Sequence, residues 1–316
     1  MQLRDETGTA VGAVGAPAAV AAPGWARSAL WRNPWRHAWF LEGFTWLYLA
    51  WSILPIALAV LFSFNSGKSQ SVWQGFSLRW YTSDPLNSVL HNPQLHQAVL
   101  QTLWLSLYTT LITVPLGVAF GIGIDRWRTR TSTAFNFVMI FSFVVPELIF
   151  GVALFFVFTA LFTSIHLGTL AEVLGLVTWN LSWPAIIVRA RLVSIGNQYE
   201  EAAADLGASR LEALRRVLLP MLMPAIFASA VLVFAGVVDD FVIVDLLSST
   251  GNTQPMSVII YSNTHGGNGG PALNALATLM LLFSFVVATL GYVGYRFMTR
   301  GERTGRQETL TSIAGM

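Results

Sequence analysis

The chain has 316 residues, of which 54% are hydrophobic and only 11% are charged, and its formal net charge is +2. A soluble domain carries roughly a quarter charged residues, so this composition indicates a protein that crosses a membrane several times. The sequence contains no cysteine, which excludes a disulfide framework, thiol catalysis and a cysteine-bound metal.

The N-terminal region is expected to remain in the cytoplasm. Residues 1–24 are rich in Ala, Gly, Val and Pro without a sustained period, which is typical of a disordered tail. Tryptophans and arginines alternate over residues 25–39, a pattern typical of a helix that lies among lipid headgroups. We therefore expect residues 1–40 to form a cytoplasmic tail with an interfacial helix that anchors it to the bilayer.

Six apolar runs follow, and each is long enough to cross a bilayer, which takes about 20 residues. They cover residues 44–64, 98–122, 136–162, 172–190, 221–246 and 273–297. The fourth run is the weakest because Asn180, Ser182 and Pro184 interrupt it, a break that is tolerated where a helix is buried against other protein. The expected fold is all-α: a transmembrane domain of six helices at 41–298, followed by a cytoplasmic tail at 299–316.

The basic residues predict the orientation of these runs. All of the 18 Lys and Arg residues except Lys68 and Arg79 lie before the first run, between the second and third, from the end of the fourth to the fifth, or at and after the end of the sixth. Lys and Arg accumulate in cytoplasmic segments. Both termini and the segment between the fourth and fifth runs are therefore expected in the cytoplasm.

Residues 65–97 then form the longest external loop. Gly67-Lys68-Ser69 has the ending of a phosphate-binding loop, but Phe62 stands where such a loop needs a glycine, and the site is external. No nucleotide site is expected. The loop also carries an aromatic pattern at Trp73, Gly75-Phe76-Ser77-Leu78 and Trp80-Tyr81. Aromatic side chains in this loop would pack against the helices, a role that is compatible with the pattern also being a family signature.

The third run contains Pro146-Glu147 near its middle. In a helix that begins near Phe137, a rise of about 1.5 Å per residue places Glu147 about 15 Å along, near the bilayer midplane. A carboxylate there is costly unless it is paired, hydrated or protonated. Glu147 is therefore either an acid that lines a transport pathway or a structural group that bonds a neighbouring helix or caps a helix restarting after Pro146.

The polar segment 196–220, between the fourth and fifth runs, is expected to form two short helices. Asn197 is a candidate N-cap of the first helix, with Glu200 as its capping-box partner. Gly207 is expected to end this helix because glycine readily adopts the left-handed conformation. The apolar face of this helix carries Tyr199, Ala202, Ala203 and Leu206.

The second of these helices begins with another candidate capping box, Ser209 and Glu212, and Pro220 is expected to end or kink it. A helix–Gly–helix hairpin with a face of small residues suits docking into a groove of another protein, with charged side chains at the rim. The alternative is an ordinary amphipathic connector between two membrane helices.

The fifth run contains Asp239-Asp240-Phe241. Measured from a helix start near Pro224, Asp240 lies about 24 Å along, in the outer third of the run. Adjacent residues of a helix point about 100° apart, so we expect one aspartate to face a pathway and the other a neighbouring helix. Two close acids repel one another unless a cation is near, which favours a cationic substrate. A solvated helix end is the alternative.

Glu201-Ala202-Ala203, Gly207, Val217 and Leu219-Pro220 resemble, in residue type and spacing, the EAA loop of ABC-importer permeases. Val217 replaces the usual isoleucine. In that family the loop is the coupling helix, which sits in a cleft of the cytoplasmic ATPase. The resemblance implies that coupling to an ATPase depends on Glu201, Ala202, Ala203, Gly207, Leu219 and Pro220.

The external aromatic pattern, the Pro146-Glu147 pair and the run that starts at Asp239 are similar to permeases of the spermidine/putrescine type. The resemblance covers roughly residues 40–298 and implies a type I ABC-importer permease fold that works by alternating access in a bacterial cytoplasmic membrane. It implies two copies of a cytoplasmic ATP-binding cassette ATPase, a second permease subunit and an extracytoplasmic solute-binding protein as partners. Glu147, Asp239 and Asp240 would line the substrate pathway, and no cofactor, metal or nucleic acid is expected.

Three alternatives to a polyamine permease are open. A permease of the same type could carry iron, phosphonate, thiamine or an opine, because the binding protein usually sets selectivity. A secondary transporter is less favoured because the two halves show no internal repeat. An intramembrane Ser–His protease needs a histidine within the membrane, whereas the five histidines here lie in tails or loops.

Overall fold

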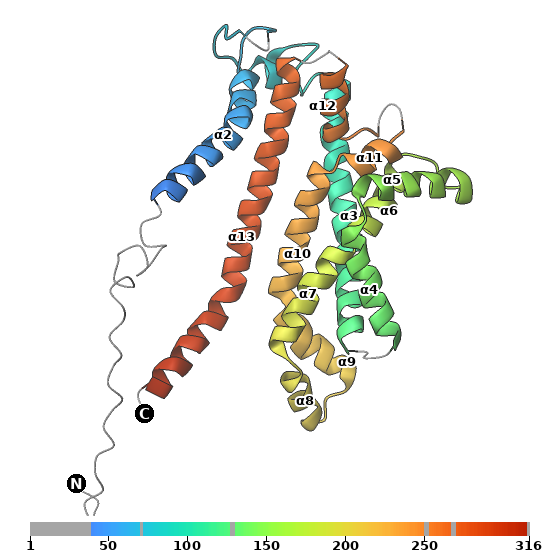
Figure 1. Ribbon diagram of the computed structural model, residues 1–316, viewed down its shortest axis with the longest axis vertical. Helices are drawn as coiled ribbons and strands as arrows, with labels where there is room; N and C mark the ends of the chain where they lie inside the picture. Colours follow the sequence, from blue (N-terminus) through green and yellow to red (C-terminus); the bar gives the residue numbers. More distant parts are fainter. Residues whose placement is uncertain (1–38, 70–71, 127–129, 250–252, 267–269, 315–316) are drawn as a thin grey trace, which may run out of the picture. The chain divides into compact units, whose positions relative to one another are not determined.

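The computed structural model describes residues 39–69, 72–126, 130–249, 253–266 and 270–314 (Figure 1). The tail expected at 1–24 and the interfacial helix expected at 25–39 lie outside these residues, except for Trp39. Every regular element within the described ranges is a helix, and one antiparallel bridge joins Asn65 to Phe76. The all-α prediction is confirmed.

The helices are numbered as in Figure 1. They are α2 (Trp39–Ser63), α3 (Pro93–Arg126), α4 (Arg130–Val144), α5 (Glu147–Phe156), α6 (Thr169–Asn180), α7 (Ser182–Ile195), α8 (Gln198–Asp205), α9 (Arg210–Ala213), α10 (Leu219–Asp239), α11 (Val242–Leu247), α12 (Met256–His265) and α13 (Pro271–Ala314). Short π-helical segments cover Arg79–Ser83, Val157–Leu161 and Leu214–Leu218. The chain divides into two compact units at Ile56 and Ala57, and the packing described below belongs to the second unit.

The predicted membrane spans correspond to long apolar helices in the structure. Five helical stretches of the described chain are long and apolar enough to cross a membrane: Trp39–Ser63, Pro93–Arg126, Thr169–Ile195, Arg210–Asp239 and Pro271–Phe297. A bent pair, Ser132–Val144 with Glu147–Leu161, adds a sixth if it counts as one span. The fourth predicted run is divided into α6 and α7 at Leu181, whose backbone angles stay helical, and most of its apolar stretch is buried, as its polar interruptions required.

The third apolar run is divided by an extended residue. Pro146 has a ψ of 132°, outside the helical range, and its ring also disfavours the helical conformation at the preceding residue. As a result α4 ends at Val144, α5 begins at Glu147, and the two helical parts are bent by 108° (Figure 1). The expectation of one continuous helix through Glu147 is therefore wrong. Glu147 starts a new helix instead, which was the structural alternative.

The fifth apolar run also ends earlier than predicted. α10 stops at Asp239, Asp240 is extended with a ψ of 126°, and α11 begins at Val242. The carboxylate Oδ1 of Asp240 accepts a hydrogen bond from the backbone N–H of Ile243 at 3.2 Å, which satisfies a free donor at the start of α11. The expectation that both aspartates lie on one helix is therefore wrong. The break separates the directions of their side chains.

The core of the second unit is built by α3, α7 and α10, which pack against one another. Glycines bring α3 close to α7: a Cβ at Gly117 would lie 2.3 Å from the Pro184 ring, and one at Gly121 would lie 2.8 Å from the carbonyl oxygen of Ala185. α13 packs against α10 in the same way, at Gly291 and Gly294. Close backbone approach of this kind is the usual means of helix association in lipid, where no hydrophobic force acts between helices.

Candidate functional site

The segment 196–220, hereafter the hairpin, has the predicted helix–Gly–helix form. α8 ends at Asp205, and Gly207 turns the chain with a φ of +85°. The backbone N–H of Ala208 then donates to the carbonyl of Ala203 at 3.0 Å. A Cβ at Gly207 would meet no atom within 4 Å, so the backbone conformation, rather than space, is what calls for glycine here.

The two predicted capping boxes had different outcomes. Ser209 and Glu212 form theirs: Ser209 Oγ accepts from the N–H of Glu212 at 3.3 Å, and the N–H of Ser209 donates to Glu212 Oε2 at 3.0 Å. Asn197 precedes α8, but its side chain makes no capping bond, so the first box is wrong. Asn197 and Glu200 bind Arg126 instead, because a guanidinium offers both of them charge-assisted hydrogen bonds.

Arg126, the last residue of α3, is the partner that sequence reasoning missed. One guanidinium nitrogen, Nη1, donates to Asn197 Oδ1 at 2.8 Å, and the other, Nη2, lies 2.6 Å from Glu200 Oε2 and 3.3 Å from the carbonyl of Gly196. Nη1 also pairs with Asp125 at 2.6 Å. A base in the last turn of a helix is a recognisable signal, but no local spacing indicates partners about seventy residues away.

Pro220 does not end the second helix. The chain stays helical from Arg210 to Asp239, and the π-helical segment Leu214–Leu218 comes just before the proline. The N–H of Leu219 reaches back to the carbonyl of Leu214, which is the longer spacing of a π turn. Pro220 follows this wider turn directly, as the second residue of α10.

The hairpin exposes apolar side chains. Leu206 is 91% exposed and Tyr199 is 46% exposed, and Ala202 is also exposed. Glu201 is exposed beside a groove of about 1110 Å³. Residues of α3, α8, α9 and α10 line this groove, and most of them are apolar. A helix outside the apolar runs that presents Leu and Tyr in this way is typical of a surface that another protein covers.

The three candidate pathway acids lie in two places. Glu147, at the start of α5, and Asp240, between α10 and α11, interact through their side chains. The carbonyl of Asp240 also accepts from Ser257 Oγ of α12 at 2.6 Å, which links the break in the fifth run to α12. Two neighbouring acidic side chains make a site that attracts a cation.

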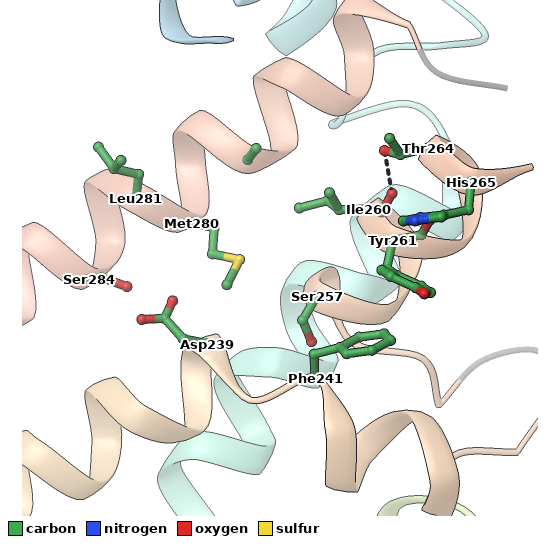
Figure 2. A pocket seen from close by; sticks show the side chains of 11 residues that line it. Asp239, Phe241, Ser257, Ile260, Tyr261, Thr264, His265, Met280, Leu281 and Ser284 are labelled. Carbon is green, nitrogen blue, oxygen red and sulfur yellow. Dashed lines mark hydrogen bonds between the residues drawn. The ribbon is translucent and has the colours of Figure 1, made fainter. Parts of the chain in front are cut away.

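Asp239 lies instead in a cavity of about 600 Å³ between α10, α12 and α13 (Figure 2). Figure 2 shows its carboxylate beside Ser284 of α13. The α12 side of the cavity is aromatic: the ring of Tyr261 lies 4.2 Å from that of Phe241 and 4.0 Å from that of His265, centroid to centroid. A cavity lined by both an acid and aromatic rings is an arrangement that suits a cationic group.

The external aromatic pattern has a structural role at Trp80. This side chain is 3% exposed, packs in a cluster that includes Leu95 and Met256, and donates from Nε1 to the carbonyl of Asn65 at 2.6 Å. Arg79 lies over the same ring and pairs with Asp84 at 2.7 Å. The interpretation of aromatic packing against the helices is confirmed for Trp80.

Comparison with known proteins identifies the family. Residues 113–304, which include the hairpin, match the family of binding-protein-dependent transport system inner membrane components. The chain is 34% identical over 277 residues to the putrescine transport system permease protein PotI of Escherichia coli (strain K12), covering 86% of this chain and 93% of that protein. It is 29% identical over 259 residues to the spermidine/putrescine transport system permease protein PotC of the same strain, covering 82% and 95%.

A solved structure has the same fold. The chain is similar, with a TM-score of 0.65, to a chain of a bacterial ABC transporter involved in the import of the acidic polysaccharide alginate. The alignment covers 86% of this chain and all of that chain at 16% identity, so the likeness concerns the fold alone.

The chain therefore belongs to the family of binding-protein-dependent transport system inner membrane components. It is a multi-span permease of the inner membrane and a component of an ABC transporter, not itself an ATPase. The family that the EAA-like loop predicted is confirmed.

Proposed function

We propose that this permease imports polyamines, of the putrescine or spermidine class, by alternating access. The observation that carries the proposal is the 34% identity to a putrescine permease over 93% of that protein's length. The acids at Glu147, Asp239 and Asp240 support it, because a polyamine carries several ammonium groups that need carboxylates along the way. The aromatic wall of Phe241 and Tyr261 adds cation–π attraction of about 0.5–2 kcal/mol per ring.

In this proposal the hairpin transmits the motion of the ATPase. Two copies of a cytoplasmic ATPase close on ATP, and the exposed face around Glu201 and Ala202 moves with them. A second permease subunit completes the pathway, and an extracytoplasmic binding protein delivers the cargo to it. Gly207 keeps the hairpin folded back, and Leu219-Pro220 joins it to α10, so the displacement reaches the membrane helices.

The test is uptake by the reconstituted importer. The permease, its second subunit and the ATPase are placed in vesicles with the loaded binding protein, and labelled putrescine and spermidine are followed with and without ATP. ATP-dependent accumulation of either amine is the expected result. Uptake driven by an ion gradient without ATP would contradict the importer mechanism. ATP-driven uptake of a neutral or anionic solute, with no response to polyamines, would contradict the cargo.

A further inference from the structure

Arg126 joins the end of α3 to the beginning of the hairpin. Its two guanidinium nitrogens reach three groups at the junction of α7 and α8: the carbonyl of Gly196, the side-chain oxygen of Asn197 and the carboxylate of Glu200. The three distances are 3.3, 2.8 and 2.6 Å. A planar guanidinium fork that binds three acceptors holds their relative positions far better than a single ion pair does.

The surroundings of Arg126 strengthen this connection. The side chain of Arg126 is 22% exposed and that of Glu200 is 26% exposed, so water and salt screen the pair less than they screen a surface ion pair. Asp125, which is 11% exposed, pairs with the same guanidinium at 2.6 Å and orients it. The connection is therefore a partly buried network rather than an isolated contact.

The hairpin has covalent connections to only two of the helices around it. It continues from α7 through Gly196 and runs into α10 through the helix that starts at Arg210. α3 has no such continuity with it, because the two are separated in the chain by α4 to α7. Among the described residues, Arg126 supplies the charged link between α3 and the hairpin.

We propose that Arg126 is a positioning residue for transport: it makes α3 move together with the hairpin when the ATPase displaces the hairpin. The inference rests on the coupling role of the hairpin in the proposed function, but not on the identity of the cargo. α3 packs closely against α7 through Gly117 and Gly121, so the helix bundle keeps its fold without Arg126. Without Arg126, the ATPase still hydrolyses ATP and displaces the hairpin, but α3 no longer moves with the hairpin.

The first test measures transport per ATP hydrolysed in the reconstituted importer. For Arg126→Gln we expect normal co-purification with the ATPase and normal basal hydrolysis, but a ratio reduced roughly fivefold or more, as is typical of coupling between two sites. Arg126→Lys keeps the charge but reaches fewer acceptors, so its ratio of transport to ATP hydrolysis should lie between those of the wild-type protein and Arg126→Gln. Arg296→Gln is the control because it removes the same charge from an exposed position on α13.

A double-mutant cycle separates this role from general destabilisation. Glu200→Gln keeps the contacts of Arg126 to Gly196 and Asn197, so its effect should be smaller and in the same direction. Combined with Arg126→Gln it should add little, because the two residues share one network. A fully additive pair, or a wild-type ratio in Arg126→Gln, would overturn the proposal.

The second test needs no transported substrate. Because the chain has no cysteine, spin labels placed at Gly123→Cys on α3 and Ala204→Cys on α8 report one distance. A Cβ at Gly123 meets no atom within 4 Å, and Ala204 is exposed, so both positions accept a label. We expect a narrow distance distribution that stays the same when the ATPase binds ATP, and a broader one in Arg126→Gln.

A failure of the proposed role of Arg126 can be told apart from a failure of the proposal that the cargo is a polyamine. A wild-type importer that moves no polyamine but shows this narrow, ATP-independent distance would overturn the cargo and leave the role of Arg126 standing. A distance that changes on ATP binding in the wild-type protein, or that Arg126→Gln leaves unaltered, would overturn the role of Arg126 whatever the cargo is. If Arg126→Gln fails to assemble, Glu200→Gln is compared in the same measurement. An unaltered distance distribution in Glu200→Gln would then overturn the role of Arg126.

Discussion

Gly207 provides the turn of the hairpin at a φ of +85° with open space around its α-carbon. That conformation costs a residue with a Cβ about 1–2 kcal/mol more than it costs glycine, and the cost is higher for a β-branched residue. We therefore expect Gly207→Val to disturb the hairpin without disturbing the membrane helices. Insertion should be normal, whereas the ATPase activity stimulated by the loaded binding protein should be lost.

The control for that experiment is Gly43→Val on α2, where glycine also has open space but no left-handed conformation. In Gly43→Val the loaded binding protein should still stimulate the ATPase activity fully. Full stimulation in Gly207→Val would show that the hairpin tolerates a different turn and that its predicted role is wrong.

Asp84 gives the external loop a dependence on pH. Hydrogen bonds from Arg79 and from the backbone N–H groups of Asn87 and Leu86 lower the pKa of Asp84 from 3.8 to about 2. A carboxyl group whose pKa is lower in the folded state stabilises the fold above its unfolded pKa, and the contribution disappears as pH falls through the folded pKa. The difference in Tm between the wild-type protein and Asp84→Asn should be constant above about pH 4 and shrink between about pH 4 and pH 2.

The measurement is thermal unfolding in detergent over that pH range, with Lys68→Gln as a control that changes charge in the same loop. A Tm difference that is independent of pH down to about 2 would mean that the Asp84 carboxylate does not contribute through its ionised form.

In the proposed function, α8 is the element through which the hairpin contacts the ATPase. Its exposed positions include Glu201, for which we expect a contact with basic or backbone donor groups of the ATPase. A like-charge contact at an interface costs several kcal/mol, and about 1.4 kcal/mol is a tenfold change in affinity. Glu201→Lys should therefore reduce the ATPase that co-purifies by roughly tenfold or more.

Glu201→Gln tests whether charge is the cause, because it keeps the shape of the side chain, and it should have an intermediate effect. Recovery of the ATPase at wild-type yield with Glu201→Lys would argue against docking through this face of α8.

The breaks within two apolar runs have a shared consequence. α5 starts at Glu147 because Pro146 is extended, and α10 ends at Asp239 because Asp240 is extended. Each break brings a carboxyl group to a helix end, and the carboxylate of Asp240 accepts a hydrogen bond from a free backbone donor there. The two ends meet where Glu147 and Asp240 interact, while Asp239 is left facing α13 (Figure 2).

Uptake by the whole importer should reflect this division of the acids. Asp240→Asn and Glu147→Gln should each reduce polyamine uptake by roughly tenfold or more, since a hydrogen bond to a charged group contributes about 1.5–3 kcal/mol. Their double variant should be scarcely worse than either one, because they act on one site. Asp239→Asn should add its own independent reduction. Each rate is compared with basal ATPase activity, which should not change.

Asp245→Asn, which changes an exposed acid on α11, is the matched control and should transport normally. Wild-type polyamine uptake in all three acid variants would mean that the acids are structural, and the argument for a cationic cargo from the pathway would fail.

Local signals in the sequence were enough to predict a multi-span membrane protein and several of its parts, and the resemblance to the EAA loop predicted the family. Apolar length predicted the spans, the EAA-like spacing predicted the family, and Gly207 and the Ser209–Glu212 box predicted the hairpin. These signals are readable because each depends on neighbours within one turn or one helix.

The remaining features depend on contacts between distant parts of the chain. The π-helical segment before Pro220 let a helix continue through a residue expected to end or kink it. Asn197 and Glu200 bind Arg126 instead of capping α8, because a charge-assisted network is more stabilising than a single neutral cap. Asp239 and Asp240 face different sites because α10 ends between them. Periodicity cannot indicate such choices, since they depend on which helices pack together and on which charged groups that packing brings within reach.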